Sequence, residues 1–220
     1  MARTVALVGA LHPAARELAL ALEDDPGVER VLGLSRHEPP LLGPKFEFVQ
    51  AGPGDPAFAE ALAGVDTLVL FPLIDAADRN EEGRRSRVVE GTRRTLEAAA
   101  GTATVVLWSS GVVYGAHPDN PVPIPETQPT RPNPEFPAAG VLAESERIAL
   151  EAGEAVVVLR GAGVWAPAWG TFLARSLMAP AMIGVRGQDP PLQCLAPADA
   201  VSALALAASL APTQSSGATL

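Results

Sequence analysis

Hydroxyl groups end an apolar run in the middle of the chain. Residues 104–115 read Thr-Val-Val-Leu-Trp-Ser-Ser-Gly-Val-Val-Tyr-Gly, so Ser109, Ser110 and Tyr114 follow a segment typical of a buried strand. His117 comes three residues after the tyrosine. Hydroxyl and imidazole groups can donate hydrogen bonds to a ligand, and histidine can also act as an acid or base. The pattern predicts that these side chains meet a ligand; the alternatives are a core strand with an ordinary turn and a solvated loop histidine.

Strand and helix patterns that could position these groups alternate along the chain. Strands are expected at 4–8, 30–34, 46–49, 65–71, 104–108 and 155–159, and helices at 13–22, 56–62, 82–100, 138–152, 169–177 and 197–210. This alternation predicts an α/β fold with a doubly wound parallel sheet and helices on both faces. Ligands of such sheets bind outside the carboxyl ends of the strands, where Ser110 and Tyr114 would stand.

Proline dominates the segment 117–137, which carries eight prolines and therefore cannot be helical. A loop of this length inside a compact domain is usually functional or mobile, so we expect a lid over the end of the fifth strand. Without any linker or repeat, the whole span 1–220 is expected to form a single domain with a small C-terminal appendage.

Composition and charge exclude several classes of function. A net charge of -9 and a pI near 4.8 argue against binding to nucleic acid or to an acidic membrane surface. The single cysteine, Cys194, excludes an internal disulfide, and three scattered histidines do not suggest a zinc site. No leader-like start and no apolar run of about 18 residues occur, so we expect a cytoplasmic protein.

Several stretches in this order resemble the extended short-chain dehydrogenase/reductase family, of the NAD-dependent epimerase/dehydratase type. They are the first strand with Gly9, and the segments 61–66, 90–92, 109–115, 125–127, 159–167 and 197–201. The resemblance covers nearly the whole chain and implies a Rossmann-like fold that binds NAD(P), a small-molecule substrate, and a homo-oligomer as one form of assembly. Family members continue into a substrate-binding lobe; here we expect a reduced lobe around 165–200, with little to hold a large nucleotide sugar.

The resemblance also implies where the cofactor would lie. The family's loop Gly-x-x-Gly-x-x-Gly reads Gly9, His12 and Ala15 here, and the middle glycine normally lets the backbone approach the pyrophosphate. We interpret His12 either as a plain loop residue or as a cationic phosphate ligand. The implied cofactor-binding residues are Gly9, Leu11, His12, Ser35, Arg36, Phe71, Pro72 and Leu73.

The end of the second strand bears on which cofactor is bound. A carboxylate there would bind the ribose 2′-hydroxyl of NAD, whereas an arginine suits the 2′-phosphate of NADP. The chain has Ser35-Arg36, which favours NADP over NAD; the alternative is an exposed loop arginine. Gly52 stands where the family usually presents an aspartate toward the adenine, which removes one contact.

The catalytic residues depart most from the family. The family has a Tyr-x-x-x-Lys pair in which the lysine lowers the tyrosine pKa. At the aligned positions this chain has Phe136 and Gly140 instead. Tyr114 is the only tyrosine and Lys45, between the second and third strands, is the only lysine. Ser110 matches the family's substrate-orienting hydroxyl. The candidate catalytic set is therefore Ser110, Tyr114 and His117, without the family's proton relay.

Three functions remain open from the sequence. The first is an NAD(P)-binding protein without the family's catalysis, acting as a sensor or regulatory partner. The second is an oxidoreductase or epimerase/dehydratase that acts on a small carbonyl or sugar with a substitute acid or base, for which His117 is the candidate. The third is a scaffold that binds no cofactor, which His12 and Gly52 favour.

Overall fold

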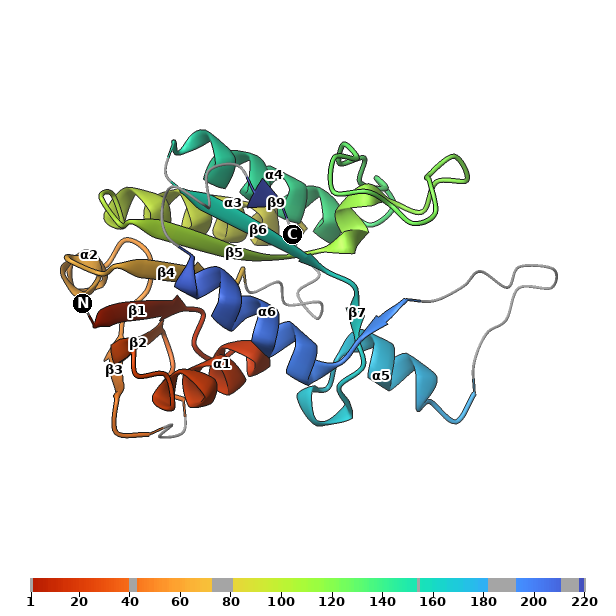
Figure 1. Ribbon diagram of the computed structural model, residues 1–220. Helices are drawn as coiled ribbons and strands as arrows, with labels where there is room; N and C mark the ends of the chain where they lie inside the picture. The colour runs from red at the N-terminus through yellow and green to blue at the C-terminus, as the bar shows by residue number, and fades with distance from the viewer. Residues whose placement is uncertain are drawn as a thin grey trace.

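One parallel sheet with helices on both faces forms the molecule (Figure 1). The computed structural model describes residues 2–39, 43–72, 81–153, 155–181, 193–210 and 218–219. The strands of the sheet are β1 (Arg3–Val8), β2 (Val28–Ser35), β3 (Phe46–Gln50), β4 (Thr67–Leu70), β5 (Thr104–Ser110), β6 (Val156–Gly161) and β9 (Ala218–Thr219). Their order is β3-β2-β1-β4-β5-β6-β9, and every described neighbouring pair is parallel. The predicted Rossmann-like doubly wound fold is confirmed.

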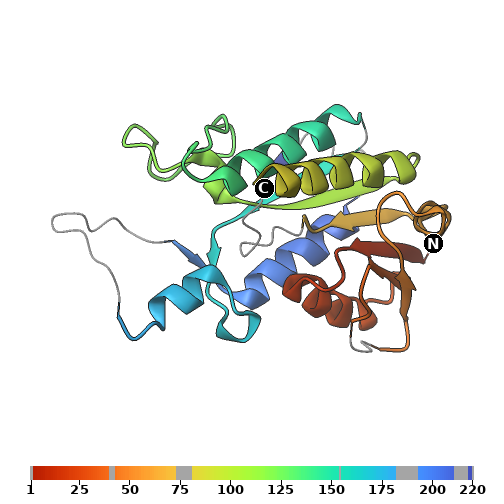
Figure 2. The same cartoon turned by 180° about the vertical axis from the view of Figure 1, so that it is seen from behind.

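The helices divide between the two faces of this sheet (Figures 1 and 2). The helices are α1 (Pro13–Glu23), α2 (Pro56–Leu62), α3 (Glu81–Ala98), α4 (Pro137–Glu151), α5 (Phe172–Leu177) and α6 (Pro197–Ser209). Helices α1 and α6 pack together on one face, and α3 and α4 pack together on the other. Beyond the carboxyl end of β6, α5 lies beside β7 (Gly163–Val164), which pairs with β8 (Cys194–Leu195).

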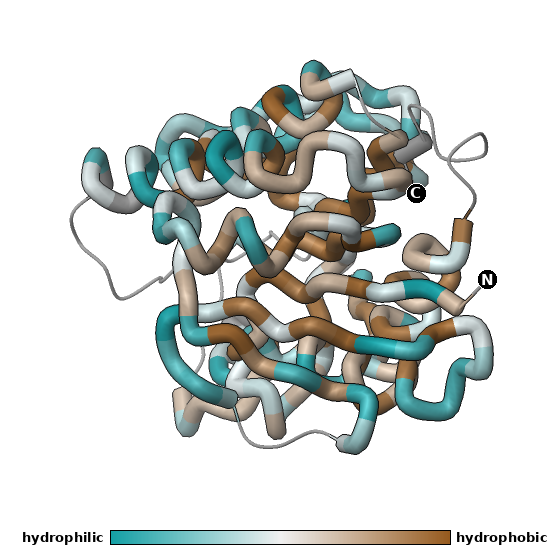
Figure 3. Tube along the Cα trace, turned by 90° about the vertical axis from the view of Figure 1, so that its left-hand side faces the viewer, coloured by the Kyte–Doolittle hydropathy of each residue, from teal (hydrophilic) through white to brown (hydrophobic). Residues whose placement is uncertain are grey.

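Both faces of the sheet are apolar, which explains why the central strands show no alternation of apolar and polar residues. In β1, Val5 and Leu7 pack toward Leu18 of α1, whereas Ala6 and Val8 pack toward Phe58 of α2. These four residues, which form the second part of β1, are all buried. Figure 3 shows the apolar strands running through the middle of the molecule between more polar outer segments.

Two expectations about the C-terminal third need correction. The predicted helix 169–177 is divided into a short 3-10 helix η2 (Pro167–Trp169) and α5, because Gly170 adopts a left-handed conformation with φ of 62°. Thr171 then starts α5 by accepting the Ala174 N–H through its side chain. Strand β9 was not predicted, since two residues give no readable pattern.

Side chains from the start of three strands hold the end of α6. The carbonyl oxygen of Ala208 accepts hydrogen bonds from Arg3 Nη1 at 2.9 Å and from Thr67 Oγ1 at 3.3 Å. The Leu210 carbonyl accepts one from Thr104 Oγ1 at 3.3 Å. These bonds supply partners for carbonyls that a helix end leaves without one, and they join α6 to β1, β4 and β5.

Candidate functional site

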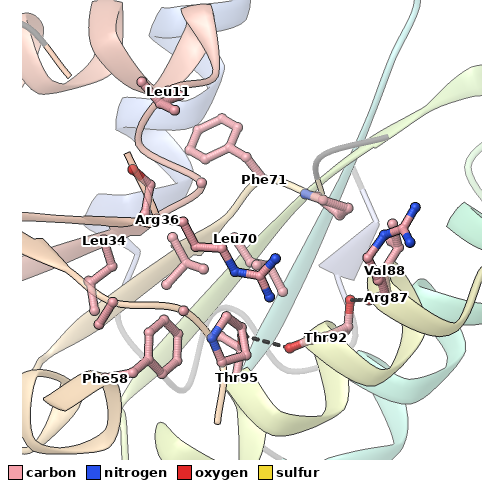
Figure 4. A pocket seen from close by; sticks show the side chains of 18 of the residues that line it. Leu11, Leu34, Arg36, Phe58, Leu70, Phe71, Arg87, Val88, Thr92 and Thr95 are labelled. Atoms are coloured by element: carbon pink, nitrogen blue, oxygen red, sulfur yellow. Dashed lines mark hydrogen bonds between the residues drawn. The ribbon is translucent and has the colours of Figure 1, made fainter. Parts of the chain in front are cut away.

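The topological switch point of the sheet opens on a cavity of about 450 Å³. Adjacent strands β1 and β4 continue into α1 and α3 on opposite faces, and this reversal leaves a crevice at their carboxyl ends. The cavity is lined by the ends of β1, β2, β3 and β4 and by one side of α3 (Figure 4). Its walls are mostly apolar, with Leu34, Phe58, Leu70 and Phe71 among them.

Gly9 shapes the turn that leads from β1 into the cavity wall. Its φ of 87° disfavours any side chain, and an added Cβ would lie 2.6 Å from the Phe71 carbonyl oxygen. Its N–H donates to the Leu34 carbonyl at 3.0 Å. Gly9 therefore brings the β1 loop into contact with the ends of β2 and β4. Leu11, which follows in the same loop, is one of the lining residues.

Ser35 and Arg36 lie at the end of β2 and line the cavity with different orientations. The Ser35 hydroxyl donates to the His37 carbonyl and so supports the turn. Arg36 is exposed, and its side chain reaches into the cavity in Figure 4. The guanidinium lies over Gly52, where an added Cβ would stand 2.9 Å from Arg36 Nε. Arg36 thus occupies the space next to Gly52 that an aspartate side chain would use.

One side of α3 forms the wall that sequence reasoning did not assign to the site. Val88, Gly91, Thr92 and Thr95 line the cavity. The hydroxyl of Thr92 donates to the Val88 carbonyl at 2.9 Å, and that of Thr95 donates to the Gly91 carbonyl at 2.7 Å. Both hydroxyls therefore bond their own helix. The family-like segment 90–92 was the available signal for this wall.

His12 caps α1 and is turned onto Phe71. Its Nδ1 accepts the Ala14 N–H at 3.2 Å, and its ring stacks on the Phe71 ring with centroids 5.1 Å apart at an interplanar angle of 20°. Burial lowers the pKa of His12 from 6.5 to about 4. The ring is therefore neutral at neutral pH, which argues against a cationic phosphate ligand. Pro72 lines the cavity beside Phe71, and Leu73 lies outside the described residues.

The end of β5 carries the predicted catalytic hydroxyls, away from the cavity lining. Ser110 is half-buried, and its Oγ accepts the Val112 N–H at 3.4 Å at the start of a 3-10 helix, η1 (Gly111–Tyr114). Tyr114 is buried and packs against Val113 and Leu142. Neither Ser110 nor Tyr114 lines the cavity at the switch point, so a cleft at this end of the sheet stays a prediction.

A buried ionic network surrounds Tyr114. Arg160 donates to Glu146 Oε2 from Nε at 3.0 Å and from Nη2 at 2.8 Å, and to Tyr114 Oη from Nη1 at 2.9 Å. The Ser109 hydroxyl donates to the other oxygen of Glu146. The Arg160 and Glu146 side chains are 9% and 2% exposed. Burial alone lowers the pKa of Arg160, but its bonds to Glu146 and Tyr114 raise that pKa, with a net increase.

The cation beside the only tyrosine is thus an arginine. Lys45 donates to the Asp25 carbonyl at 2.8 Å, at the opposite end of the strands. In the sequence, Arg160 stood out only as part of the family-like segment 159–167, and no pattern indicated that Glu146 would be its partner. Phe136, at the family's tyrosine position, is 51% exposed at the start of α4.

His117 stabilises the proline-rich loop. Its Nε2 lies 2.8 Å from the Arg131 carbonyl oxygen, while the Arg131 N–H donates to the Val113 carbonyl at 2.9 Å. Arg131 also pairs with Asp119 through two hydrogen bonds and holds the pKa of that carboxyl below its usual value. The loop extends outward from the end of β5 (Figures 1 and 2). Its role as a lid stays a prediction.

The described residues contain neither a metal cluster nor a membrane-spanning helix. Among them, no group of three or more histidine, cysteine, aspartate or glutamate side chains is placed to hold a metal ion. No helix in the described part of the chain has the length and apolar character needed to cross a membrane.

Comparison with known proteins gives distant sequence relatives. No protein-family model matches the chain. Uncharacterized proteins of Mycobacterium bovis and Mycobacterium tuberculosis are 30% identical to it over 223 residues, which cover 94% of this chain. The chain spans 59% of the length of these curated relatives.

Solved structures show the fold more clearly. MoeE5 in complex with UDP-glucuronic acid and NAD has a TM-score of 0.76 at 23% identity, over 94% of this chain and 72% of that one. A short-chain dehydrogenase/reductase superfamily protein from Agrobacterium tumefaciens with bound NAD has a TM-score of 0.76 at 22% identity, over 98% and 76%. The dTDP-glucose 4,6-dehydratase DesIV from Streptomyces venezuelae, a double mutant with NAD bound, has a TM-score of 0.74 at 23% identity, over 94% and 73%. The chain therefore has the fold of the extended short-chain dehydrogenase/reductases, of the NAD-dependent epimerase/dehydratase type.

Proposed function

We propose that this chain binds NAD(P), with NADP preferred, in the cavity at the switch point, and that it acts as a binding or regulatory protein without the family's tyrosine relay. The observation that carries the proposal is the cavity itself. It lies at the point of the sheet where dinucleotides bind in this architecture, has mostly apolar walls, and is also lined by the cationic side chains of Arg36 and Arg87.

The cofactor class is supported by the solved neighbours, whose structures contain NAD. The preference for NADP rests on Arg36, because a guanidinium can form two charge-assisted hydrogen bonds with a 2′-phosphate. Ser35, which precedes it, offers no carboxylate to bind a free 2′-hydroxyl. The Gly9 turn, where an added Cβ would meet the Phe71 carbonyl, holds the β1 loop against the end of β4 and so shapes this wall of the cavity.

The proposed absence of the family's catalysis is supported by the residues that stand in place of its tyrosine and lysine. Phe136 and Gly140 supply neither a phenol nor an ammonium group. Tyr114 Oη accepts a hydrogen bond from Arg160, whose charge is shared with Glu146 inside the protein. The proton-exchanging group and the activating cation that the family places on one helix are therefore replaced by a buried structural network.

Titration of the protein with NADPH and NADH, followed by cofactor fluorescence, tests the proposal. We expect wild type to bind NADPH about tenfold to a hundredfold more tightly than NADH, and Arg36→Ala to remove that preference with little effect on NADH. Arg147→Ala, at an exposed arginine that pairs with Glu151 at 2.6 Å on α4, is the matched control. Equal wild-type affinities for the two cofactors would contradict the NADP preference, and no binding of either would favour the scaffold interpretation.

A second candidate is an enzyme with a substitute acid or base, acting on a small carbonyl or sugar. The observation in its favour is the 2.9 Å contact between Arg160 and Tyr114, which gives the lone phenol a cationic neighbour. We expect no turnover of aldehydes, ketones or nucleotide sugars with either cofactor. Robust wild-type turnover that Tyr114→Phe abolishes would establish this second function, and loss only in His117→Ala would assign the proton transfer to the histidine.

A further inference from the structure

We propose that His12, held against Phe71, keeps a diphosphate away from the start of α1, so that the site recognises a 2′-phosphorylated adenosine group rather than a dinucleotide as a whole. The inference rests on the proposed function, because it assumes that the cavity takes the adenosine half of NADP. It makes His12 the residue that determines which nucleotides bind with useful affinity.

The amide groups at the start of α1 already have partners. A diphosphate bound at a helix start needs free N–H groups of the first turn. Pro13 has no N–H, the Ala14 N–H donates to His12 Nδ1 at 3.2 Å, and the Ala15 N–H donates to the His12 carbonyl at 2.9 Å. The His12 side chain thus uses the Ala14 amide, and the main-chain carbonyl at the same position uses the Ala15 amide.

The ring also occupies the approach to these amides. It stacks on Phe71 across the gap between the loop after β1 and the end of β4, with ring centroids 5.1 Å apart. A diphosphate that reached the helix would have to break this stack and the cap together. In the resembled family a glycine stands at this position and leaves the same space open.

His12 does not compensate with charge. Burial holds its pKa far below neutral, and Nδ1 already accepts the Ala14 N–H, so the ring proton lies on Nε2. The ring therefore offers a diphosphate one neutral N–H at most, in place of the several backbone amides of an open glycine loop.

Calorimetric titration with adenosine 2′-monophosphate and with NADP⁺ separates the two halves of the ligand. We expect wild type to bind both within about fivefold of each other, since the diphosphate adds little. In His12→Gly, which remains acceptable at a helix N-cap, NADP⁺ binding should tighten by about tenfold or more while adenosine 2′-monophosphate binding stays unchanged. Thermal unfolding establishes that each variant is folded.

His12→Asn is the matched control, because asparagine keeps the capping acceptor but removes the ring. Tighter NADP⁺ binding in this variant would identify the ring as the obstacle. Wild type that binds NADP⁺ about a hundredfold more tightly than adenosine 2′-monophosphate would overturn the inference and leave the proposed function standing. Weaker NADP⁺ binding in both variants would show that His12 is a ligand and would also overturn it. No binding of either probe by any variant would overturn the proposed function.

Discussion

The two ends of one sheet edge use their polar groups in opposite ways. At the β1, β2 and β4 end, apolar walls and two exposed arginines, Arg36 and Arg87, surround a cavity of about 450 Å³. At the β5 and β6 end, Ser109, Glu146, Arg160 and Tyr114 bond one another inside the protein.

The two ends depend on different features of the structure. The first end depends on backbone shape, on Gly9 and on apolar walls, and those features are also part of the core. The second end depends on a few side chains whose exchange leaves the sheet intact. We therefore expect stability to depend strongly on the buried charges at the β5 and β6 end and on the backbone shape at the β1 end.

The largest expected effect comes from opening the buried network. Arg160→Met leaves the carboxylate of Glu146, which is 2% exposed, without its cation, and should lower the free energy of unfolding by about 3–5 kcal/mol. Urea unfolding measures the loss. Arg147→Met removes an exposed pair, with side chains 54% and 62% exposed, and should cost less than about 1 kcal/mol.

A double variant identifies the cause of that loss. Arg160→Met combined with Glu146→Leu removes both charges, so it should recover much of the stability. If the double variant is no more stable than Arg160→Met alone, the lost packing of the arginine, rather than an unpaired charge, explains the result. Equal losses in Arg160→Met and Arg147→Met would contradict the structural role of the network.

A smaller effect is expected from the Gly9 turn. Gly9→Ala introduces a side chain at a φ of 87° and a Cβ 2.6 Å from the Phe71 carbonyl oxygen, so stability should fall by about 2–3 kcal/mol. Gly153→Ala provides the control, because Gly153 has a similar φ of 77° with nothing within 4 Å of an added Cβ. Its loss should be about 1 kcal/mol. Identical losses would show that the approach to Phe71 imposes no constraint.

The smallest expected effect is a pH dependence from His12. In the unfolded chain His12 takes up its proton near pH 6.5, but in the folded protein only near pH 4. Between these pH values the unfolded state binds more protons than the folded state. The contribution of neutral His12 to the free energy of unfolding is therefore complete above about pH 6.5 and is lost as the pH falls from about 6.5 toward 4. Thermal unfolding should therefore show that wild type loses more stability than His12→Asn between about pH 7.5 and 5. Parallel loss in both proteins would assign the pH dependence to other groups.

The sequence predicted the sheet well because its strands are buried on both faces. The runs at 4–8, 30–34 and 104–108 are continuous and apolar, and turn residues or caps end them, so period and length identify them. The predicted helix 169–177 is confirmed over 172–177, but its predicted start was too early because nothing in the sequence shows that Gly170 takes a positive φ. Strand β9 was too short to recognise.

The sequence predicted the site residues that lie next to the end of a strand, but not the contacts between segments that are distant in the sequence. Gly9, Arg36 and Phe71 each end a strand, and strand ends can be located from the pattern. The contact of Arg160 with Glu146 and Tyr114 joins a strand, a helix and a turn, and no spacing encodes it. The stacking of His12 on Phe71 was missed for the same reason, because it depends on how two loops meet.

The hydrogen bonds at the end of α6 set an order for folding during synthesis. Arg3 donates to the Ala208 carbonyl, which lies 205 positions later in the chain. Thr67 and Thr104 also donate to carbonyls at the end of α6, so none of these bonds can form before α6 is synthesised. While the ribosome is still translating the second half, one face of β1, β4 and β5 has no final cover, and their apolar side chains stay accessible to chaperones or to other nascent chains. This face of the sheet should therefore become protease-resistant only once α6 has left the ribosome.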